Sequence, residues 1–362
     1  MPMSWELQEA WTHVQARLTG EIMVDASLIP WLRGIVGLVL IGGLFGAGMA
    51  AIWIERKLAG DIQERYGPNR VGPMGIFQLV ADAIKLFTKE DIIPKNVDKL
   101  LYVSAPIIIM GSIFLMLVAI PIGAVYINGV EYPLVVTEMD ISVLYIEAIS
   151  AISVIGIFVL GYGQNNKYAM MGTFRNIARM IGYELPLGIT IVSVAIMANS
   201  LDIVEIVNSQ NPLWFAILQP LGFVIFFIAM VADMGRLPFD QNEAEEELQA
   251  GVFTEYSGMR FGLAFFSEYF HMILGSFLIS LLFLGGWNLP GFITNNFILG
   301  LILPTAFLVA KATIVMMFII MLRWALPRFR IDQVVDLSWK RLLPLSLINL
   351  GWAMALGIYL GV

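Results

Sequence analysis

Acidic side chains are concentrated in one stretch of a strongly hydrophobic chain. Residues 232–270 join two apolar runs, with Asp233 at the end of the first run and Glu268 inside the second. The connection between them carries six more acids: Asp240, Glu243, Glu245, Glu246, Glu247 and Glu255. Glu147 and Glu184 fall inside other apolar runs. A charged group near the centre of a membrane helix costs roughly 2.5–3.5 kcal/mol on insertion scales, so we expect these acids to face a bundle interior and to handle protons or ions.

Part of this acidity also has a purely structural interpretation. Asp240 and Glu243 are spaced like the start of a capped helix, and Gly251 can end that helix. A solvated acidic face would explain the glutamates equally well. Among the other polar residues of the apolar runs, His271 and Tyr269 are more often packing residues than functional ones, although a phenol could donate a hydrogen bond to a quinone carbonyl. Lys311 is a further charge that should face the interior.

The composition defines the class of protein. The chain has 362 residues, of which 59% are hydrophobic and 14% are charged, as expected for a polytopic membrane protein. It has no cysteine, which excludes iron–sulfur clusters and thiolate zinc sites held by this chain, and it has no dinucleotide-binding glycine motif. We therefore expect no metal and no cofactor bound by this chain, and membrane lipid rather than nucleic acid around it.

The hydropathy predicts an all-α fold of about eight transmembrane helices, since each span needs about 20 apolar residues. The expected spans are 31–54, 101–125, 141–162, 177–199, 213–235, 261–286, 297–325 and 341–361. They form one membrane domain, 31–362, with long connections at 55–100 and 236–260, preceded by a surface segment, 1–30. Apolar residues at helical spacing after Gly75 predict an amphipathic helix along the membrane interface. The small residues of the first span predict close helix packing: Gly42, Gly43, Gly46, Ala47 and Ala50.

The basic residues predict the orientation. With eight spans, 18 of the 21 lysines and arginines, Arg179 among them, fall on one side, while Arg17 and Arg33 fall on the other. By the positive-inside rule the basic side is cytoplasmic. Both termini are then extracytoplasmic, in a multi-pass protein of the cell inner membrane.

The first connection, residues 55–91, combines turns with basic residues. Arg56, Arg65 and Arg70 could line the mouth of a cavity, because arginine keeps its charge there and can hold a carboxylate or a polar headgroup. The alternative is a solvated basic loop followed by a membrane-anchoring helix.

Four motifs make the chain resemble a known family. They are ERK…QERYGPNRVGPMGIFQLVADAIKLFTKED from residue 55, NNKYAMMGTFRNIARMIGYE at 165–184, RLPFDQNEAEEELQAGVFTEYSG with FFSEY, and PRFRIDQVVDLSWKRLLP at 327–344. Over about residues 30–360 the sequence resembles the H subunit, also called subunit 1, of respiratory complex I, the proton-pumping NADH:quinone oxidoreductase. The chain has Asp233 where this family usually has glutamate.

The resemblance implies one wall of a quinone chamber and a chain of carboxylates that couples quinone reduction to proton translocation. The implied acids are Glu147, Glu184, Asp233, Glu247, Glu255 and Glu268, with Asp82 near the chamber. We add Glu243 and Glu245 of the acidic connection to these candidates, and assign Arg56, Arg65, Arg70 and Tyr269 to the chamber wall. Quinone, or a quinone-like phenazine, would be the substrate. The implied partners are hydrophilic subunits that hold the iron–sulfur clusters and antiporter-like membrane subunits.

The electron donor and the class of function stay open from the sequence. The donor could be NADH, a reduced deazaflavin or ferredoxin, because relatives with each donor would share these motifs. Two other classes of function remain as alternatives: the membrane anchor of an energy-converting hydrogenase, and a stand-alone ion transporter.

Overall fold

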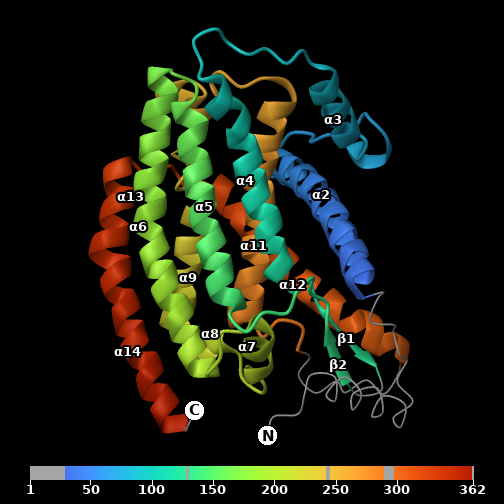
Figure 1. Cartoon of the computed structure of the whole chain (residues 1–362), viewed down its shortest axis with the longest axis vertical. Coiled ribbons are helices and arrows are strands. Elements are labelled where there is room, and N and C mark those ends of the chain that lie inside the picture. Colours follow the sequence, from blue (N-terminus) through green and yellow to red (C-terminus); the bar gives the residue numbers. More distant parts are fainter. Residues whose placement is uncertain (1–28, 128–129, 242–244, 289–296, 361–362) are drawn as a thin grey trace, which may run out of the picture.

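Long helices run side by side through most of the molecule. The computed structural model describes residues 29–127, 130–241, 245–288 and 297–360. The expected surface segment at 1–30 and Glu243 therefore lie outside the described residues, except for positions 29 and 30. Figure 1 shows the bundle from the side, with two ends that carry different connections.

Seven described helices are long and apolar enough to cross a membrane, which confirms a polytopic all-α protein. They are α2 (Ile29–Ile62), α4 (Lys99–Ala119), α5 (Ser142–Tyr162), α6 (Lys167–Ala198), α11 (Gly258–Phe283), α12 (Phe297–Ala325), and α13 (Ile331–Leu337) continued through a π-helical segment (Ser338–Leu342) into α14 (Leu343–Leu360).

The expected fifth span, 213–235, differs from the other seven. It consists of a single turn, α8 (Phe215–Leu218), and a 14-residue helix, α9 (Pro220–Asp233). Proline lacks an amide hydrogen and is suited to the first position of a helix, which explains why α9 starts afresh at Pro220. At 1.5 Å per residue α9 is about 21 Å long, whereas the hydrocarbon core is about 30 Å thick. The chain then continues through 234–241 as a largely buried, irregular segment.

A small hairpin replaces the end of the expected second span. Helix α4 ends at Ala119, and the chain turns into strands β1 (Ala124–Ile127) and β2 (Val130–Pro133), paired antiparallel with Ala124 opposite Pro133. The Thr305 hydroxyl of α12 donates to the Ala124 carbonyl at 3.3 Å. The hairpin and α7 (Ile203–Ser209) lie at the lower end of the bundle in Figure 1. The described chain begins and ends at this same end, as an even number of passes requires.

The opposite end carries the amphipathic helix predicted after Gly75. This helix, α3 (Gln78–Thr88), stands to one side of the bundle in Figure 1 and leaves Val80, Ile84 and Phe87 exposed. The indole of Trp53 in α2 donates to the Met74 carbonyl at 3.2 Å, which ties the loop before α3 to the bundle. An exposed apolar face on a short charged helix fits a position at the membrane surface.

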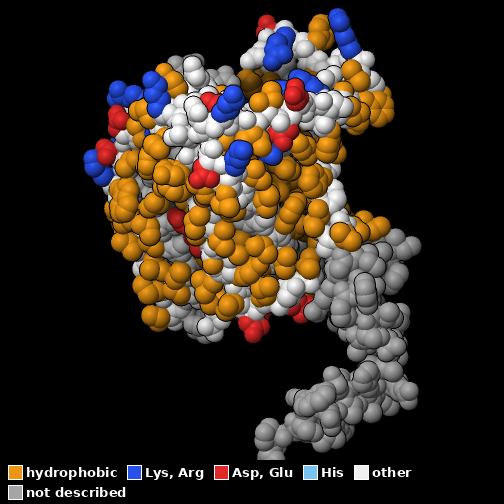
Figure 2. All heavy atoms as spheres, turned by 45° about the horizontal axis from the view of Figure 1, so that its top comes forward, with side chains coloured by type: hydrophobic (Ala, Val, Ile, Leu, Met, Phe, Trp, Pro, Cys, Tyr) orange, Lys and Arg blue, Asp and Glu red, His pale blue; other side chains and the backbone are white. Residues whose placement is uncertain are grey.

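Lysine and arginine side chains gather over the end that carries α3, above a broad apolar band (Figure 2). One basic residue does not follow this pattern. Arg179, counted with the loop charges, is only 1% exposed and lies within α6. That expectation is wrong, because the helix begins ten residues before the expected start of the span and carries Arg179 into the bundle.

The small residues of α2 do not pack as expected. A β-carbon added at Gly42, Gly43 or Gly46 would meet no described atom within 4 Å. Gly43, Ala47 and Ala50 instead line an apolar crevice of about 430 Å³ between α2 and helices α4, α11 and α12. Close approach of α2 to the bundle occurs at Gly48, whose added β-carbon would press on the Phe270 ring.

Candidate functional site

A chamber of about 980 Å³ opens where α2, the loop after it, α11 and α12 meet. All four residues that the sequence assigned to a chamber wall line it: Arg56, Arg65, Arg70 and Tyr269. Asp82 lies beside it on α3, where its Oδ2 is 2.6 Å from Arg56 Nη1 and its Oδ1 accepts from the Gln78 amide at 3.2 Å. The amphipathic helix is thus fastened to the chamber rim by an ion pair.

Sequence reasoning missed the acid at the base of this chamber. Glu55 seemed to begin the loop, but it lies in the last turn but one of α2 and is only 5% exposed. Its carboxylate pairs with Arg323 of α12 and lies 3.6 Å from Nη1 of Arg236. The signal that could have found it is the buried face of α2, on which Glu55 follows Ile52 and Ala51.

Arg236 joins this chamber to the bundle interior. It follows α9 in the irregular segment, and its guanidinium carbon lies 4.0 Å from the centroid of the Tyr269 ring. Burial opposes its charge, but Tyr269, Glu55 and Glu268 outweigh burial and raise the pKa of Arg236 above its ordinary value. A raised arginine pKa stabilises the fold at every pH below the unfolded pKa, which is above about 12. Arg236 therefore remains a fixed positive charge at physiological pH.

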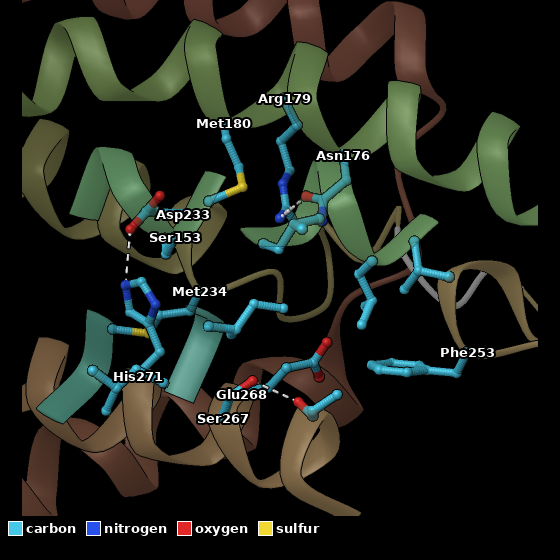
Figure 3. Close-up of a pocket in the computed structure, with 16 residues that line it drawn as sticks. Ser153, Asn176, Arg179, Met180, Asp233, Met234, Phe253, Ser267, Glu268 and His271 are labelled. Atoms are coloured by element: carbon cyan, nitrogen blue, oxygen red, sulfur yellow. Dashed lines mark hydrogen bonds and ion pairs between the residues drawn. The ribbon is translucent and has the colours of Figure 1, made fainter. Parts of the chain in front are cut away.

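Two consecutive residues of α11 face different cavities. Tyr269 lines the chamber, whereas Glu268 lines a buried cavity of about 40 Å³ on the other side. Water needs about 10–15 Å³ in this measure, so the smaller cavity has room for a few molecules. Figure 3 shows Glu268 and Ser267 of α11 facing Arg179 and Asn176 of α6 across this space. The chamber and the buried cavity are therefore lined by adjacent residues of one helix, so a change of charge in the chamber occurs close to Glu268.

Arg179 holds the irregular segment against α6. One guanidinium nitrogen donates to the Phe239 carbonyl at 2.9 Å and the other donates to the Asn176 side chain. The segment is also joined to the loop before α13, since the Phe329 amide donates to the Pro238 carbonyl at 3.1 Å and the Gln241 side chain donates to the Phe329 carbonyl at 2.8 Å. These bonds satisfy backbone groups that have no helical partner.

Asp233 and His271 connect the buried cavity to a second one. His271 Nε2 lies 3.0 Å from Asp233 Oδ2, and both side chains are about nine-tenths buried (Figure 3). The second cavity, of about 20 Å³, is lined by the same pair together with Glu147 and Ser150 of α5. The expectation that His271 merely packs missed this contact, because a pair between α9 and α11 cannot be seen from local spacing.

Glu147 and Glu184, both partly buried, are the remaining acids of the apolar runs. Glu147 lies against α6, where a β-carbon added at Gly188 would be 3.3 Å from its Oε1. Its charge interacts with those of Asp233 and Glu184. Glu268 thus shares the larger cavity with Asp233 and His271, and Glu147 shares the smaller cavity with the same pair. Glu184 lies outside both cavity linings but interacts electrostatically with Glu147 and Asp233.

The other predicted acids lie away from this series. Glu247 is exposed on α10 (Glu245–Leu248) and pairs with Arg175, and Glu255 accepts from the Asn166 amide at 2.8 Å at the end that carries α3. The Glu245 side chain lies outside the described part of the chain. These contacts agree with the structural interpretation of the acidic connection more than with a buried path.

Lys311 faces inward as expected but lies at the other end of the bundle. Its ammonium donates to the Leu284 carbonyl at 2.6 Å and the Gly286 carbonyl at 2.8 Å, beyond the last turn of α11. A positive charge suits the carbonyl end of a helix. Lys311 thus has a structural role apart from the acids. In the described ranges, no group of three histidine or acidic side chains is arranged to hold a metal ion.

Comparison with known proteins decides the family. Residues 35–354 match the family model for NADH dehydrogenase. The chain belongs to this family. Members similar to it include the H subunit of F(420)H(2) dehydrogenase from Methanosarcina acetivorans, 70% identical over 334 residues that cover 92% of this chain and 96% of the relative. The H subunit of NADH-quinone oxidoreductase from Dehalococcoides mccartyi is 44% identical over 321 residues, 88% of this chain and 86% of the relative.

Membership in the NADH dehydrogenase family confirms the resemblance drawn from the four motifs. A further relative, the H subunit of NADH-quinone oxidoreductase from Thermomicrobium roseum, is 42% identical over 328 residues, 88% of this chain and 93% of the relative. The matched range includes most of α2, most of α14 and every described helix between them, together with the residues that line the chamber and the two interior cavities.

Proposed function

We propose that this chain is the membrane subunit of a complex I-like, proton-pumping oxidoreductase in which reduced F420 is the electron donor. The relatives at 67–70% identity are named for F(420)H(2), whereas those named for NADH are 38–44% identical. This difference favours the deazaflavin donor, and these names favour a dehydrogenase complex over a hydrogenase anchor or a stand-alone transporter. The chain itself supplies no redox group in this proposal, and partner subunits carry the iron–sulfur clusters.

The chamber is where the lipid-soluble acceptor, a quinone or a quinone-like phenazine, would be reduced. Its wall combines the apolar and aromatic surface of Phe265, Tyr269 and Trp324 with the cations Arg56, Arg65 and Arg323. Such a wall accepts a flat ring and offers donors to its carbonyl or ring nitrogen atoms. Reduction takes up protons, so it changes the charge balance next to Glu55 and Arg236.

The neighbouring positions of Tyr269 and Glu268 are the observation that carries the coupling part of the proposal. Arg236 interacts electrostatically with both residues. A change in charge at Tyr269 or Glu55 alters the field that Arg236 presents to Glu268, and the proton occupancy of Glu268, Asp233, Glu147 and Glu184 changes in response. These acids would pass the response to antiporter-like partner subunits.

The orientation and partners follow from the same proposal. The end that carries α3 and the basic loops is cytoplasmic and meets the hydrophilic subunits, and the end with the β hairpin is extracytoplasmic. The protein is then a multi-pass subunit of the cell membrane, surrounded by lipid.

The test uses inverted membrane vesicles that contain the whole complex. Reduced F420 and a water-soluble naphthoquinone are supplied, and donor oxidation and proton uptake are measured together. We expect Glu147→Gln and Glu268→Gln to lower proton uptake at least about tenfold, because an amide cannot exchange a proton. Glu205→Gln, which changes an exposed acid of α7, is the control and should behave like the natural protein. Full proton uptake in both Glu147→Gln and Glu268→Gln would contradict the proposed proton path. The absence of F420-dependent activity would contradict the assignment of reduced F420 as the electron donor.

A further inference from the structure

We propose that His271 is a proton-relay residue that joins the two halves of the acidic series. The proposal rests on the proposed function, because it assigns a step within the same path. It concerns a side chain that the sequence alone indicates only as a packing residue. The observation that suggests it is the arrangement of the two buried cavities around one histidine–carboxylate pair.

Asp233 and His271 are the two residues that line both cavities. The larger cavity contains Glu268 and Arg179, and the smaller one contains Glu147. The pair therefore forms the partition between them, and a proton that moves from Glu268 to Glu147 inside the described bundle meets this pair on the way. Glu268 and His271 are three residues apart on α11, so they lie on one face of that helix.

The distance within the pair is short enough for a direct transfer. Figure 3 shows the imidazole of His271 pointing from α11 toward Asp233 of α9. The separation of 3.0 Å between Nε2 and Oδ2 is within hydrogen-bonding range for a nitrogen and an oxygen. Imidazole can accept a proton on one nitrogen and release one from the other, which makes it suited to a relay between two groups on opposite sides of its ring.

Each step of the transfer moves one proton. A proton leaves Asp233 Oδ2 as the O–H bond breaks, and an N–H bond forms at His271 Nε2, which leaves a carboxylate and an imidazolium. The imidazolium then releases a proton to Glu268, directly or through water of the larger cavity, and neutral imidazole is restored. The reverse order carries a proton from Glu268 to Asp233 and on toward Glu147.

The charged groups around the pair are of both signs. Asp233 on α9 faces the imidazole directly. Arg179 on α6 interacts electrostatically with Asp233 and Glu268, and Glu147 on α5 and Glu184 on α6 interact with Asp233. The pair thus lies among one guanidinium and carboxylates contributed by three helices, and none of these charges is on α11 next to the imidazole except Glu268.

The experiment replaces His271 in the intact complex. His271→Gln keeps an amide donor to Asp233 but cannot carry a proton, and His271→Asn is made in parallel. In inverted vesicles supplied with reduced F420 and a water-soluble naphthoquinone, we expect proton uptake to fall at least about tenfold while the complex assembles normally on native gels. Ser276→Ala is the matched control, because Ser276 is a buried residue of the same helix whose hydroxyl donates to the Met272 carbonyl.

A compensating change separates a relay from a structural contact. Adding Asp233→Glu to His271→Gln lengthens the acid by one methylene group toward the larger cavity, and we expect it to restore at least about a third of the lost proton uptake. Full pumping by an assembled His271→Gln or His271→Asn complex would overturn the proposal. So would a loss that Asp233→Glu does not restore, or failure of both variants to assemble, since these results assign His271 a structural role.

The outcome also distinguishes this proposal from the proposed function. If His271→Gln pumps normally while Glu147→Gln does not, the acidic series stands and the relay is wrong. If neither variant affects pumping, the series itself is wrong.

Discussion

Glu55 is a buried acid with two arginine neighbours, Arg236 and Arg323. Arg236 and Glu55 have side chains that are 6% and 7% exposed, whereas Arg323 is partly open to the chamber. Removing one partner of a buried ion pair leaves an uncompensated charge, which is more costly than losing the attraction itself. The stability of this region therefore depends on an acid that the sequence pattern did not reveal.

We expect Glu55→Gln to destabilise the protein by about 3 kcal/mol, at the lower end of the range for buried pairs because Arg323 is partly solvated. The melting temperature of the purified complex in detergent measures this. Asp336→Asn is the control, since the Asp336–Lys340 pair is exposed and should contribute well under about 1 kcal/mol. Equal melting temperatures for the two variants would contradict the structural importance of Glu55.

The cost of placing charge in an apolar run predicts that Glu147, Glu184, Asp233 and Glu268 face inward. Glu147, Asp233 and Glu268 line interior cavities, whereas Glu184 is partly buried and lines neither of them. Glu55 and Arg179 were missed because each lies near the expected boundary of an apolar run, where a charged residue resembles part of a loop, although α6 begins well before Arg179. The pair formed by Asp233 and His271 depends on the angle between two helices, which no local pattern contains.

At the scale of elements, the turn after α2 is held by a close approach of two backbones. A β-carbon added at Gly60 would lie 2.7 Å from the Gly67 nitrogen and 2.8 Å from the Arg65 carbonyl oxygen. Arg65, Tyr66 and Gly67 line the chamber. The position of the chamber wall at residues 65–67 therefore depends on Gly60, which does not line the chamber.

We expect Gly60→Ala to push the 65–67 backbone away and to raise the KM for a water-soluble naphthoquinone several-fold. Contact with backbone atoms at these distances costs roughly 1–3 kcal/mol unless the loop moves. Gly43→Ala in the same helix is the control, because its added methyl group meets no described atom within 4 Å. An unchanged KM in Gly60→Ala would show that the loop position is not important for the acceptor.

Hydropathy found the helices but not their ends. The runs at 141–162 and 297–325 agree with α5 and α12 to within one residue. The run at 213–235 hides the break at Pro220, and the run at 101–125 hides the turn into β1, because apolar side chains continue through both changes of backbone. Apolar composition reports the surroundings of a segment, whereas the backbone conformation depends on proline positions and on contacts with distant elements.

For the whole molecule, the absence of cysteine offers a direct test of orientation. Lys95→Cys lies on an exposed connection at the end that carries α3, and Glu205→Cys lies on α7 at the opposite end. We expect a membrane-impermeant maleimide to label Glu205→Cys in right-side-out vesicles and Lys95→Cys in inverted vesicles. The unmodified chain is the blank. Labelling of both variants from the same side would contradict the eight-pass topology.

The shortness of α9 has a mechanical consequence. Two residues separate Asp233, where the helix stops, from Arg236 beside the Tyr269 ring. The Met234 amide still donates to the Met230 carbonyl, and beyond it the backbone leaves the hydrogen-bonded ladder of the helix. A helix extended by two further turns would transmit a push at one end over its full length as a stiff rod. The short irregular connection instead allows the Arg236 guanidinium to shift against Tyr269 while the Asp233 carboxylate stays in place. A change in the electrostatic field can then pass from the acceptor to the acids with little movement of the surrounding helices.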